Sequence, residues 1–302
     1  MSETTIAGKV KKFYSRCKNY LYRKTYNRKC EKVAKQNDLL NRKTSITDNN
    51  DYPMFCYMAS EDDWVFKTFR RNPVYTDVLE HVTNELALEY LDIIKKNEAV
   101  KFTDADWDDF RKNDAYGSPI AYTYQINGRN LKMTPTTIRY AKVLQDIVSM
   151  YDITKMKKVA EIGIGYAGQC RLLTSYIKNI ESYSLIDLPE VVKLARKFLS
   201  AVGTDISKIN FIDGTKMEKG DEYDFVISNY AFSELVREVQ DGYLEKVILK
   251  SKAGYMTWNS LSRDKLGGYS VEELLAKIPG SSVIEEKPLT APDNCIIIWG
   301  NK

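Results

Sequence analysis

The stretch Val159-Ala-Glu-Ile-Gly-Ile-Gly-Tyr-Ala-Gly-Gln-Cys170 decides the fold that this 302-residue chain is expected to adopt. Residues 159–162 read as a buried strand, after which the chain turns through Gly163 and Gly165 and enters a helix near Gly168. A strand, turn and helix of this kind present a row of backbone N–H groups to whatever lies above the strand. The stretch therefore predicts a cofactor site.

The rest of residues 157–302 alternates short apolar runs with amphipathic stretches. The sequence predicts strands at 158–162, 182–186, 208–212, 223–228, 254–258, 282–287 and 294–300, and helices at 168–178, 189–202, 233–249 and 271–278. Repeated strand–helix units predict a Rossmann-like, mostly parallel seven-stranded sheet with helices on both faces. Because no helix separates the last two strands, one of them is expected to run antiparallel.

Residues 46–156 are expected to form a mainly helical, acceptor-binding region. The sequence predicts helices from 76 to about 95 and from 134 to 151, with a loop or short hairpin at 114–129. Thr134 and Pro135 are expected to open the second helix, and the acidic residues around Trp107 mark a further helix start. His81, the single histidine, is either a packed side chain of the first helix or a catalytic group.

The first 45 residues are a strongly basic leader, the first of three expected parts (1–45, 46–156 and 157–302). They carry 13 Lys and Arg against three acidic residues, a net charge of +10, whereas the rest of the chain carries −6. Apolar spacing predicts a basic amphipathic helix over 6–43. It either contacts an anionic membrane surface or a glycan-assembly complex, or packs on the core as a solvated helix. Nucleic acid is not expected, because no recognised binding module follows.

Composition limits the class of protein. The hydrophobic content of 43% is ordinary for a globular chain. No apolar run reaches the roughly 18–20 residues that cross a bilayer, and the first residues lack a secretory pattern, so a cytoplasmic location is expected. The five cysteines are scattered, form no C-x-x-C pair and are accompanied by one histidine. Reduced thiols are therefore expected, and a metal site is not.

The glycine motif admits two cofactors. Gly163-x-Gly165-x-x-Gly168 matches the dinucleotide fingerprint, and Asp187 follows at the spacing of a ribose-binding carboxylate, so NAD and S-adenosylmethionine both fit. Glu161 favours S-adenosylmethionine, because an acid here can bind the positively charged methionine portion directly or through water. Asp213 at the end of the third strand, and the last two strands without a crossover helix, favour it as well.

Several segments resemble a known family. Residues 159–169, Ile186-Asp-Leu-Pro-Glu190, Ser228-Asn-Tyr-Ala-Phe-Ser-Glu-Leu235 and Gly254-Tyr-Met-Thr-Trp-Asn259 resemble the sugar O-methyltransferases of bacterial surface-polysaccharide loci, which are class I S-adenosylmethionine-dependent enzymes. Tyr116-Gly-Ser-Pro119 and Thr137-Ile-Arg-Tyr140 add to the likeness, which covers residues 114–302. The resemblance implies methylation of a sugar hydroxyl, on a sugar nucleotide or a capsule or lipopolysaccharide intermediate, at or near the inner membrane surface.

The expected cofactor site lies at the carboxyl ends of the strands, where open α/β sheets bind ligands. The residues expected to hold the cofactor are Glu161, Gly163, Gly165, Gly168, Gln169, Asp187, Leu188, Asp213, Gly214, Ser228 and Asn229. Within this set Glu161 and the glycines face the methionine end, Asp187 the ribose and Asp213 the adenine.

Glu234, with Asn229 and Tyr230, is expected to be catalytic. Methyl transfer to an alcohol is an in-line displacement that needs the attacking oxygen positioned and its proton removed. Glu234 is either that base or an acceptor clamp, or else a charge at a helix N-terminus. The residues expected to bind the acceptor are Tyr230, Ser233, Glu234, Arg237, Trp258 and Asn259. A metal would need Asp213, Glu234 and Asp264 to converge.

Two other functions stay open from the sequence. One is an NAD(P)-dependent oxidoreductase, which uses the same glycine motif. The other is a non-catalytic adapter of a glycan-assembly complex. The sequence sets neither the sugar nor the oligomeric state.

Overall fold

The computed structural model describes Arg28, Ser45 and residues 51–302, apart from the side chains of Ser262 and Asp264. The chain divides into two compact units, residues 1–42 and residues 43–302. The amphipathic helix expected over 6–43 lies outside the described residues. Within residues 51–302, no helix is long and apolar enough to span a bilayer.

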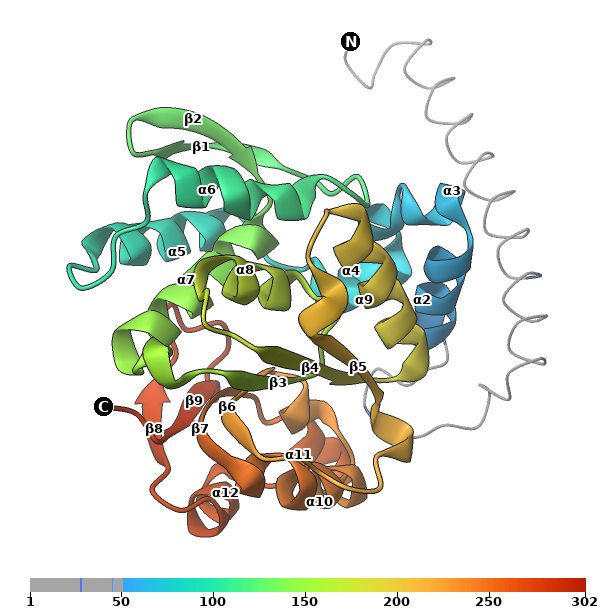
Figure 1. Ribbon diagram of the computed structural model, residues 1–302, viewed down its shortest axis with the longest axis vertical. Helices are drawn as coiled ribbons and strands as arrows, with labels where there is room; N and C mark the ends of the chain where they lie inside the picture. The colour runs from blue at the N-terminus through green and yellow to red at the C-terminus, as the bar shows by residue number, and fades with distance from the viewer. Residues whose placement is uncertain (1–27, 29–44, 46–50) are drawn as a thin grey trace. The chain divides into compact units, whose positions relative to one another are not determined.

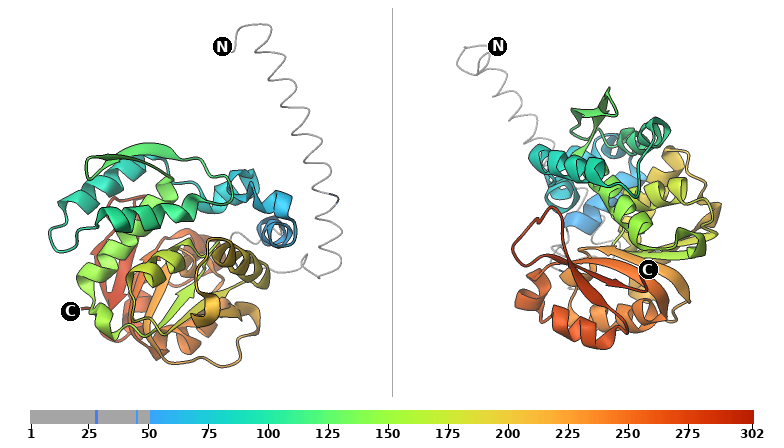
Figure 2. Two further views of the ribbon diagram at one scale, coloured as in Figure 1. Left: turned by 45° about the horizontal axis from the view of Figure 1, so that its top comes forward. Right: turned by 90° about the vertical axis from the view of Figure 1, so that its left-hand side faces the viewer.

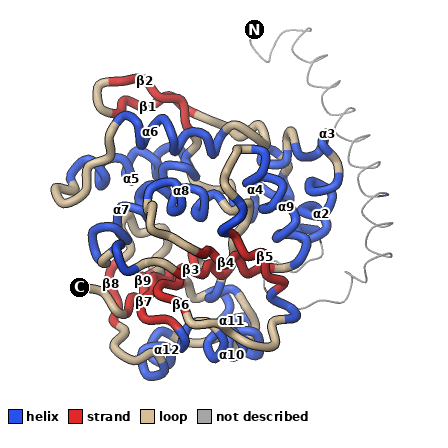
Figure 3. Tube along the Cα trace, viewed as in Figure 1, coloured by secondary structure: helices blue, strands red, loops and turns tan. Residues whose placement is uncertain are grey.

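A seven-stranded sheet forms the centre of the second unit (Figures 1 and 3). The strands are β3 (Lys158–Ile162), β4 (Ser182–Asp187), β5 (Ile209–Asp213), β6 (Tyr223–Asn229), β7 (Ser251–Trp258), β8 (Ser282–Glu285) and β9 (Cys295–Trp299). Their order is β5-β4-β3-β6-β7-β9-β8. The strands from β5 to β7 are parallel, and β9 runs antiparallel to both neighbours. This arrangement confirms the expected Rossmann-like class I methyltransferase fold and identifies β9 as the antiparallel strand.

The chain order reverses between β3 and β6, which makes the carboxyl ends of these two strands the switch point of the sheet. The register sets the strand ends level, because Asp187 pairs with Asp213 and Asn229 pairs with Thr257. The residues that follow the strands therefore meet along one edge.

Helices cover both faces of the sheet (Figures 1 and 2). One face carries α8 (Gly168–Tyr176) and α9 (Pro189–Ala201), and the other carries α10 (Arg237–Lys246), α11 (Leu261–Leu266) and α12 (Val271–Lys277). Ala160, Ile162 and Val226 of the sheet are buried with Leu244 of α10 and Leu274 of α12 in one apolar cluster. The expected capping box of Ser270 and Glu273 opens α12.

The N-terminal helices of this unit are α2 (Asp51–Glu61), α3 (Asp63–Phe66), α4 (Pro73–Leu79), α5 (Asn84–Lys96), α6 (Asp104–Phe110) and α7 (Pro135–Met150). α2 packs against α9, and α5 packs against α7. Thr134 caps α7 and Pro135 begins it, as expected. A hairpin of β1 (Tyr122–Ile126) and β2 (Arg129–Met133) precedes it, and Thr103 caps the acidic start of α6.

Two expected helices are wrong in extent. The one expected from 76 to about 95 is split into α4 and α5, because Thr83 caps a new helix start and Glu80 bonds to Arg70 and Thr136 instead. His81 therefore lies in the break. The helix expected over 233–249 begins only at Arg237, after extended residues at Leu235 and Val236, and the helix α11 was not expected.

Short 3₁₀ turns complete the secondary structure: Phe69–Arg71, Arg111–Asp114, Ile153–Lys155, Ile206–Lys208, Gly214–Lys216, Phe232–Glu234 and Ile248–Lys250. The buried guanidinium of Arg70, in the first of them, ties the N-terminal helices to the sheet domain. It bonds to Glu80, Asp114 and Thr134, and it lies 4.5 Å above the ring of Tyr166 in the glycine turn.

Candidate functional site

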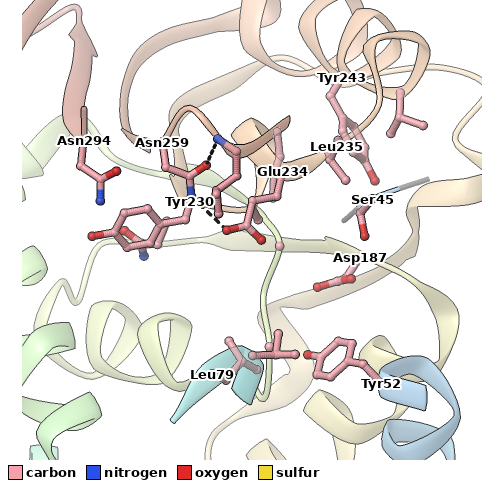
Figure 4. A pocket seen from close by; sticks show the side chains of 18 of the residues that line it. Ser45, Tyr52, Leu79, Asp187, Tyr230, Glu234, Leu235, Tyr243, Asn259 and Asn294 are labelled. Atoms are coloured by element: carbon pink, nitrogen blue, oxygen red, sulfur yellow. Dashed lines mark hydrogen bonds between the residues drawn. The ribbon is translucent and has the colours of Figure 1, made fainter. Parts of the chain in front are cut away.

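A cavity of about 1200 Å³ opens at the carboxyl ends of β3, β4, β6 and β7. The other walls come from Ser45, Tyr52 and Arg139, from α4, α5 and the break between them, from α10 and the start of α11, and from residues 290–294. Single ligand pockets usually enclose about 300–1,000 Å³, so this cavity has room for two molecules. Figure 4 shows Asp187 and Tyr52 at one side and Tyr230, Glu234 and Asn259 at the other.

Two glycines let the first turn reach the cavity wall. Gly163 and Gly165 have φ values of 76° and 51°, in the left-handed region that glycine adopts without strain. A Cβ on Gly163 would lie 1.9 Å from Cβ of Ala231, in the turn after β6. The backbone of the glycine turn therefore packs directly against the methyl group of Ala231, and both turns line the cavity.

Asp187 fastens the glycine turn and faces the cavity. Its carboxylate accepts hydrogen bonds from the backbone N–H of Ile164 at 2.8 Å and of Leu188 at 2.7 Å. Burial raises the pKa of Asp187 to about 6, against these bonds and one from Gly165, which lower it. Leu188 and Gly214 line the same part of the cavity. Of the roughly four lone-pair sites of the Asp187 carboxylate, these three bonds leave one for a ligand hydroxyl.

Glu161 is not in the cavity wall. It points to the opposite face of β3 from Ala160 and Ile162, is 3% exposed, and accepts a hydrogen bond of 2.7 Å from Oη of Tyr183. Burial raises the pKa of Glu161 to about 8, so this acid is protonated at neutral pH. Glu161 therefore lies outside the cavity and carries no negative charge at neutral pH, so it does not make the expected contact with a positively charged methionine portion.

Four other residues expected to hold the cofactor support the turns from behind. Gly168 packs on the ring of Tyr140, and the side-chain amide of Gln169 donates to the carbonyl of the same tyrosine. Ser228 donates to the carbonyl of Ile162 and accepts from the N–H of Phe232. Asp213 caps the 3₁₀ turn after β5 by accepting from Thr215.

The turn after β6 carries the strained residue of the site. Tyr230 has φ of 64°, a left-handed conformation that costs free energy for a residue with a side chain. Its N–H donates to the carbonyl of Thr257 at 3.0 Å, and its hydroxyl donates to Glu286 and lies 3.1 Å from Oγ1 of Thr290. Asn229 and Tyr230 line the cavity, as expected.

Glu234 also lines the cavity, with its carboxylate held by Asn259. The side-chain amide of Asn259 donates to Glu234 at 2.9 Å (Figure 4). Burial raises the pKa of Glu234. The alternative expected role of Glu234 was a charge at the N-terminus of the following helix. Because α10 begins only at Arg237, Glu234 does not lie in the first turn of that helix, and this alternative is wrong. Ser233 is buried behind it and joins the two loops by bonding to the carbonyl of Tyr230 and to the N–H of Asn259.

Two residues expected to bind the acceptor lie elsewhere. Arg237 pairs with Glu273 through two bonds of 3.0 Å, and its guanidinium lies 3.7 Å above the ring of Tyr269. Trp258 is buried in the apolar cluster beside α10, and its ring N–H has no hydrogen-bond partner among the described residues. Neither lines the cavity.

Sequence reasoning missed several lining residues, among them Arg139, Tyr90, Leu79 and Tyr243. Arg139 is a charged residue inside a helix that is buried on nearly every face. A charge within such a helix is a signal that could have pointed to Arg139 as a site residue. His81 also lines the cavity. Its pKa is lowered to about 4 by desolvation and by the charge of Arg139, so the imidazole is neutral at neutral pH.

No group of three or more His, Cys, Asp or Glu side chains suited to a metal ion occurs in the part of the chain that the structure describes. Asp213 and Glu234 do not form such a group, and the side chain of Asp264 is outside the description. Three cysteines of this part, Cys56, Cys170 and Cys295, are free thiols.

No protein-family model and no curated protein matches the chain. Solved structures match it in part. The mitomycin 7-O-methyltransferase MmcR is 17% identical with a TM-score of 0.42, and 54% of each chain is covered. An O-methyltransferase family protein from Burkholderia thailandensis is 15% identical with a TM-score of 0.40, over 53% of this chain and 55% of that one. The chain thus matches about half the length of these two structures. A mutant of MtNAS in complex with S-adenosylmethionine is 15% identical with a TM-score of 0.41, over 81% of this chain and 87% of that one.

Proposed function

We propose that this chain is an S-adenosylmethionine-dependent O-methyltransferase whose acceptor is a sugar hydroxyl. One observation carries the proposal: a single cavity combines a glycine turn fastened by Asp187 with a partly buried carboxyl group, Glu234, held by Asn259. The first arrangement suits a nucleoside cofactor at the switch point of an open sheet, and the second suits removal of a hydroxyl proton. The volume leaves room for an acceptor beside the cofactor.

The cofactor half of the cavity is the part around the glycine turn. S-adenosylmethionine, when bound, supplies a methyl group on a positively charged sulfur. Asp187 offers its remaining lone pair to a ribose hydroxyl, and Gly163 and Gly165 let the backbone approach closely. Gly214 also belongs here, because a Cβ at this position would lie 2.1 Å from Oη of Tyr243. A side chain there would push this phenol out of the cavity wall.

Glu234 is the proposed general base. A base works best when its pKa lies near the working pH, and burial moves the pKa of Glu234 upward from its ordinary value. The 2.9 Å bond from Asn259 fixes the orientation of the carboxylate. His81 also lines the cavity and can accept a proton, but a pKa of about 4 makes it a weak base at neutral pH. Positioning by Asn229 and Tyr230 contributes the near-attack geometry.

A sugar acceptor is supported by the family resemblance and by the polar character of the far half of the cavity. The hydroxyl, amide and imidazole groups that line it belong to His81, Tyr90, Tyr230, Asn259, Thr290 and Asn294. Aromatic rings and amide groups together suit a sugar, which stacks on rings and bonds through its hydroxyls. A sugar nucleotide or a surface-glycan intermediate of capsule or lipopolysaccharide synthesis is the proposed substrate.

Calorimetry with S-adenosylhomocysteine tests the cofactor. We expect binding by the full chain, a loss of at least about tenfold in Asp187→Asn, and no loss in Asp205→Asn. Asp205 is a matched control, because it caps a 3₁₀ turn outside the cavity by bonding to Ser207. Binding of NAD(H) but not of S-adenosylhomocysteine would make the chain an oxidoreductase. If the folded protein binds neither compound, the remaining function is the non-catalytic adapter of a glycan-assembly complex.

Mass spectrometry of sugar mixtures incubated with the enzyme and S-adenosylmethionine tests the acceptor. A gain of one methyl group on a sugar supports the proposal, and methylation of phenols only would contradict it.

The basic leader supports a separate proposal, that residues 1–45 hold the enzyme at an anionic membrane surface where glycans are built. The full chain should sediment with anionic liposomes more strongly than a chain lacking residues 1–42. Equal binding would rule out this role.

A further inference from the structure

Arg139 is a buried charge at the floor of the cavity. It lies on α7, which is buried on nearly every face, and the residue is only 8% exposed. It lines the large cavity and also a small annex of about 20 Å³ that lies among Tyr90, Tyr230 and Lys287. The guanidinium is therefore enclosed by protein but open to whatever fills the cavity.

Other buried cations of the described chain have a carboxylate partner, and Arg139 has none. Arg70 pairs with Asp114 at 3.2 Å, Arg171 with Asp109 at 3.2 Å, and Lys142 with Asp146 at 2.5 Å. No hydrogen bond or ion pair joins the guanidinium of Arg139 to any residue among 45 and 51–302. A buried ion without such a partner keeps much of its desolvation cost.

Nearby acids are already engaged. Glu80 bonds to Arg70 and to Oγ1 of Thr136, and Glu286 bonds to Tyr230 and to Thr290. Neither carboxylate is bonded to the guanidinium of Arg139, although the charge of Glu80 acts on it through space.

The neighbouring phenols do not neutralise Arg139 either. The guanidinium lies 5.6 Å from the ring centre of Tyr140 and 5.9 Å from that of Tyr230, which gives it cation–π contacts. Burial raises the pKa of Tyr90 and of Tyr140 to about 12 and raises that of Tyr230 further, so none is charged at neutral pH. Arg139 therefore meets ring faces and cavity solvent.

We propose that Arg139 binds an oxyanion of the acceptor, a carboxylate or a phosphate, so that the substrate class is an anionic sugar. The guanidinium fork matches two oxygens of either group. The acceptor is favoured over the carboxylate of the cofactor, because the lining of the annex beside Arg139, which includes Asn229, Tyr230, Glu286 and Lys287, contains no residue of the glycine turn. The identification as a sugar rests on the proposed function, whereas the oxyanion site does not.

This assignment replaces Arg237, the arginine that the sequence placed among the acceptor-binding residues. The guanidinium of Arg237 is already paired with Glu273 and stacked on Tyr269.

The first test uses inorganic phosphate and acetate as probes on the full chain, by thermal unfolding at constant ionic strength with chloride as reference. Wild-type protein should gain about 2 °C or more in Tm, and Arg139→Gln should gain nothing. Arg129→Gln is the matched control: it removes the same charge from the hairpin, where Arg129 pairs with Asp108, and it should respond like wild type. Equal responses of wild type and Arg139→Gln would overturn the proposal.

The second test names the source of the oxyanion, by calorimetry on protein saturated with S-adenosylhomocysteine. Methyl glucuronide, glucose 1-phosphate and methyl glucoside differ in carrying a carboxylate, a phosphate or no charge. At least one charged sugar should bind more tightly than the neutral one. Arg139→Gln should lower the affinity for that charged sugar at least about tenfold, and the affinity for S-adenosylhomocysteine should stay within about threefold. A loss of S-adenosylhomocysteine affinity alone would assign Arg139 to the cofactor instead and overturn the proposal. If S-adenosylhomocysteine does not bind to wild type, the proposed methyltransferase function is wrong. The oxyanion site is then still tested by the thermal unfolding with phosphate and acetate.

Discussion

Replacing Gly163 by alanine tests whether the two turns of the site are locked together. The new Cβ would lie 1.9 Å from Cβ of Ala231 and 3.4 Å from its Cα, at a φ of 76°. The first distance is far below van der Waals contact, and no flexible side chain is available to yield. Either the glycine turn or the turn after β6 must therefore move.

The expected magnitude has two parts. A left-handed conformation costs alanine about 1–2 kcal/mol relative to glycine. Overpacking of a filled contact adds about 1–3 kcal/mol. Gly163→Ala should therefore lower the free energy of unfolding by about 2–5 kcal/mol, and Tm should fall by about 5–15 °C for a unit of this size. Binding of S-adenosylhomocysteine should weaken as well, because either movement changes the cavity wall: the glycine turn carries the N–H of Ile164 bonded to Asp187, and the turn after β6 carries Tyr230.

Gly203→Ala separates the conformational cost from the overpacking cost. Gly203 has a φ of 74° and nothing within 4 Å of its virtual Cβ, so only the conformational cost of about 1–2 kcal/mol applies. The double variant Gly163→Ala/Ala231→Gly removes the clashing methyl group and should recover the overpacking part. In a double-mutant cycle followed by urea unfolding, we expect a coupling energy of about 1–3 kcal/mol. Equal destabilisation by Gly163→Ala and Gly203→Ala, with no coupling, would refute the contact between the turns.

Three further predictions concern acids of the site. Glu161→Gln should keep S-adenosylhomocysteine affinity within about threefold at pH 7, where the acid is already protonated. The unfolded chain releases this proton above the ordinary pKa of 4.5, whereas the folded chain releases it only near 8. In urea unfolding, the variant should therefore gain stability over wild type between pH 5 and 8. Affinity for S-adenosylhomocysteine should rise about tenfold from pH 5 to 7 as Asp187 ionises near pH 6, and calorimetry should show no such rise in Asp187→Asn. Glu234→Gln should lower kcat at least about 100-fold while leaving KM within a few-fold; an equal loss through KM would make Glu234 a clamp.

Local sequence patterns were sufficient for the sheet and for part of the cavity wall near the glycine turn. Gly163, Gly165 and Asp187 were predictable because strand, turn and spacing constrain each other along one short stretch of chain. Leu188 and Gly214 followed from the same rule that strand ends meet at one edge. Asn229 and Tyr230 were placed by that rule as well.

Long-range partners set the rest of the site and could not be predicted. Glu161 looked like a ligand group until Tyr183, on the neighbouring strand, proved to be its partner. Arg237 looked free until Glu273, 36 residues away, proved to be bonded to it. The break between α4 and α5 depends on Arg70, which takes Glu80 away from the helix pattern.

Ser45 determines where the chain can be cut. It pairs with Leu235 in an isolated antiparallel bridge and forms part of the cavity wall, and the compact unit begins at Lys43. An expression clone that starts at residue 46, the boundary suggested by charge, would lose a piece of that wall beside the turn that carries Glu234. Its lower activity would then be misread as a catalytic role of the basic leader. A clone that starts at Lys43 removes most of the positive charge and leaves the wall intact.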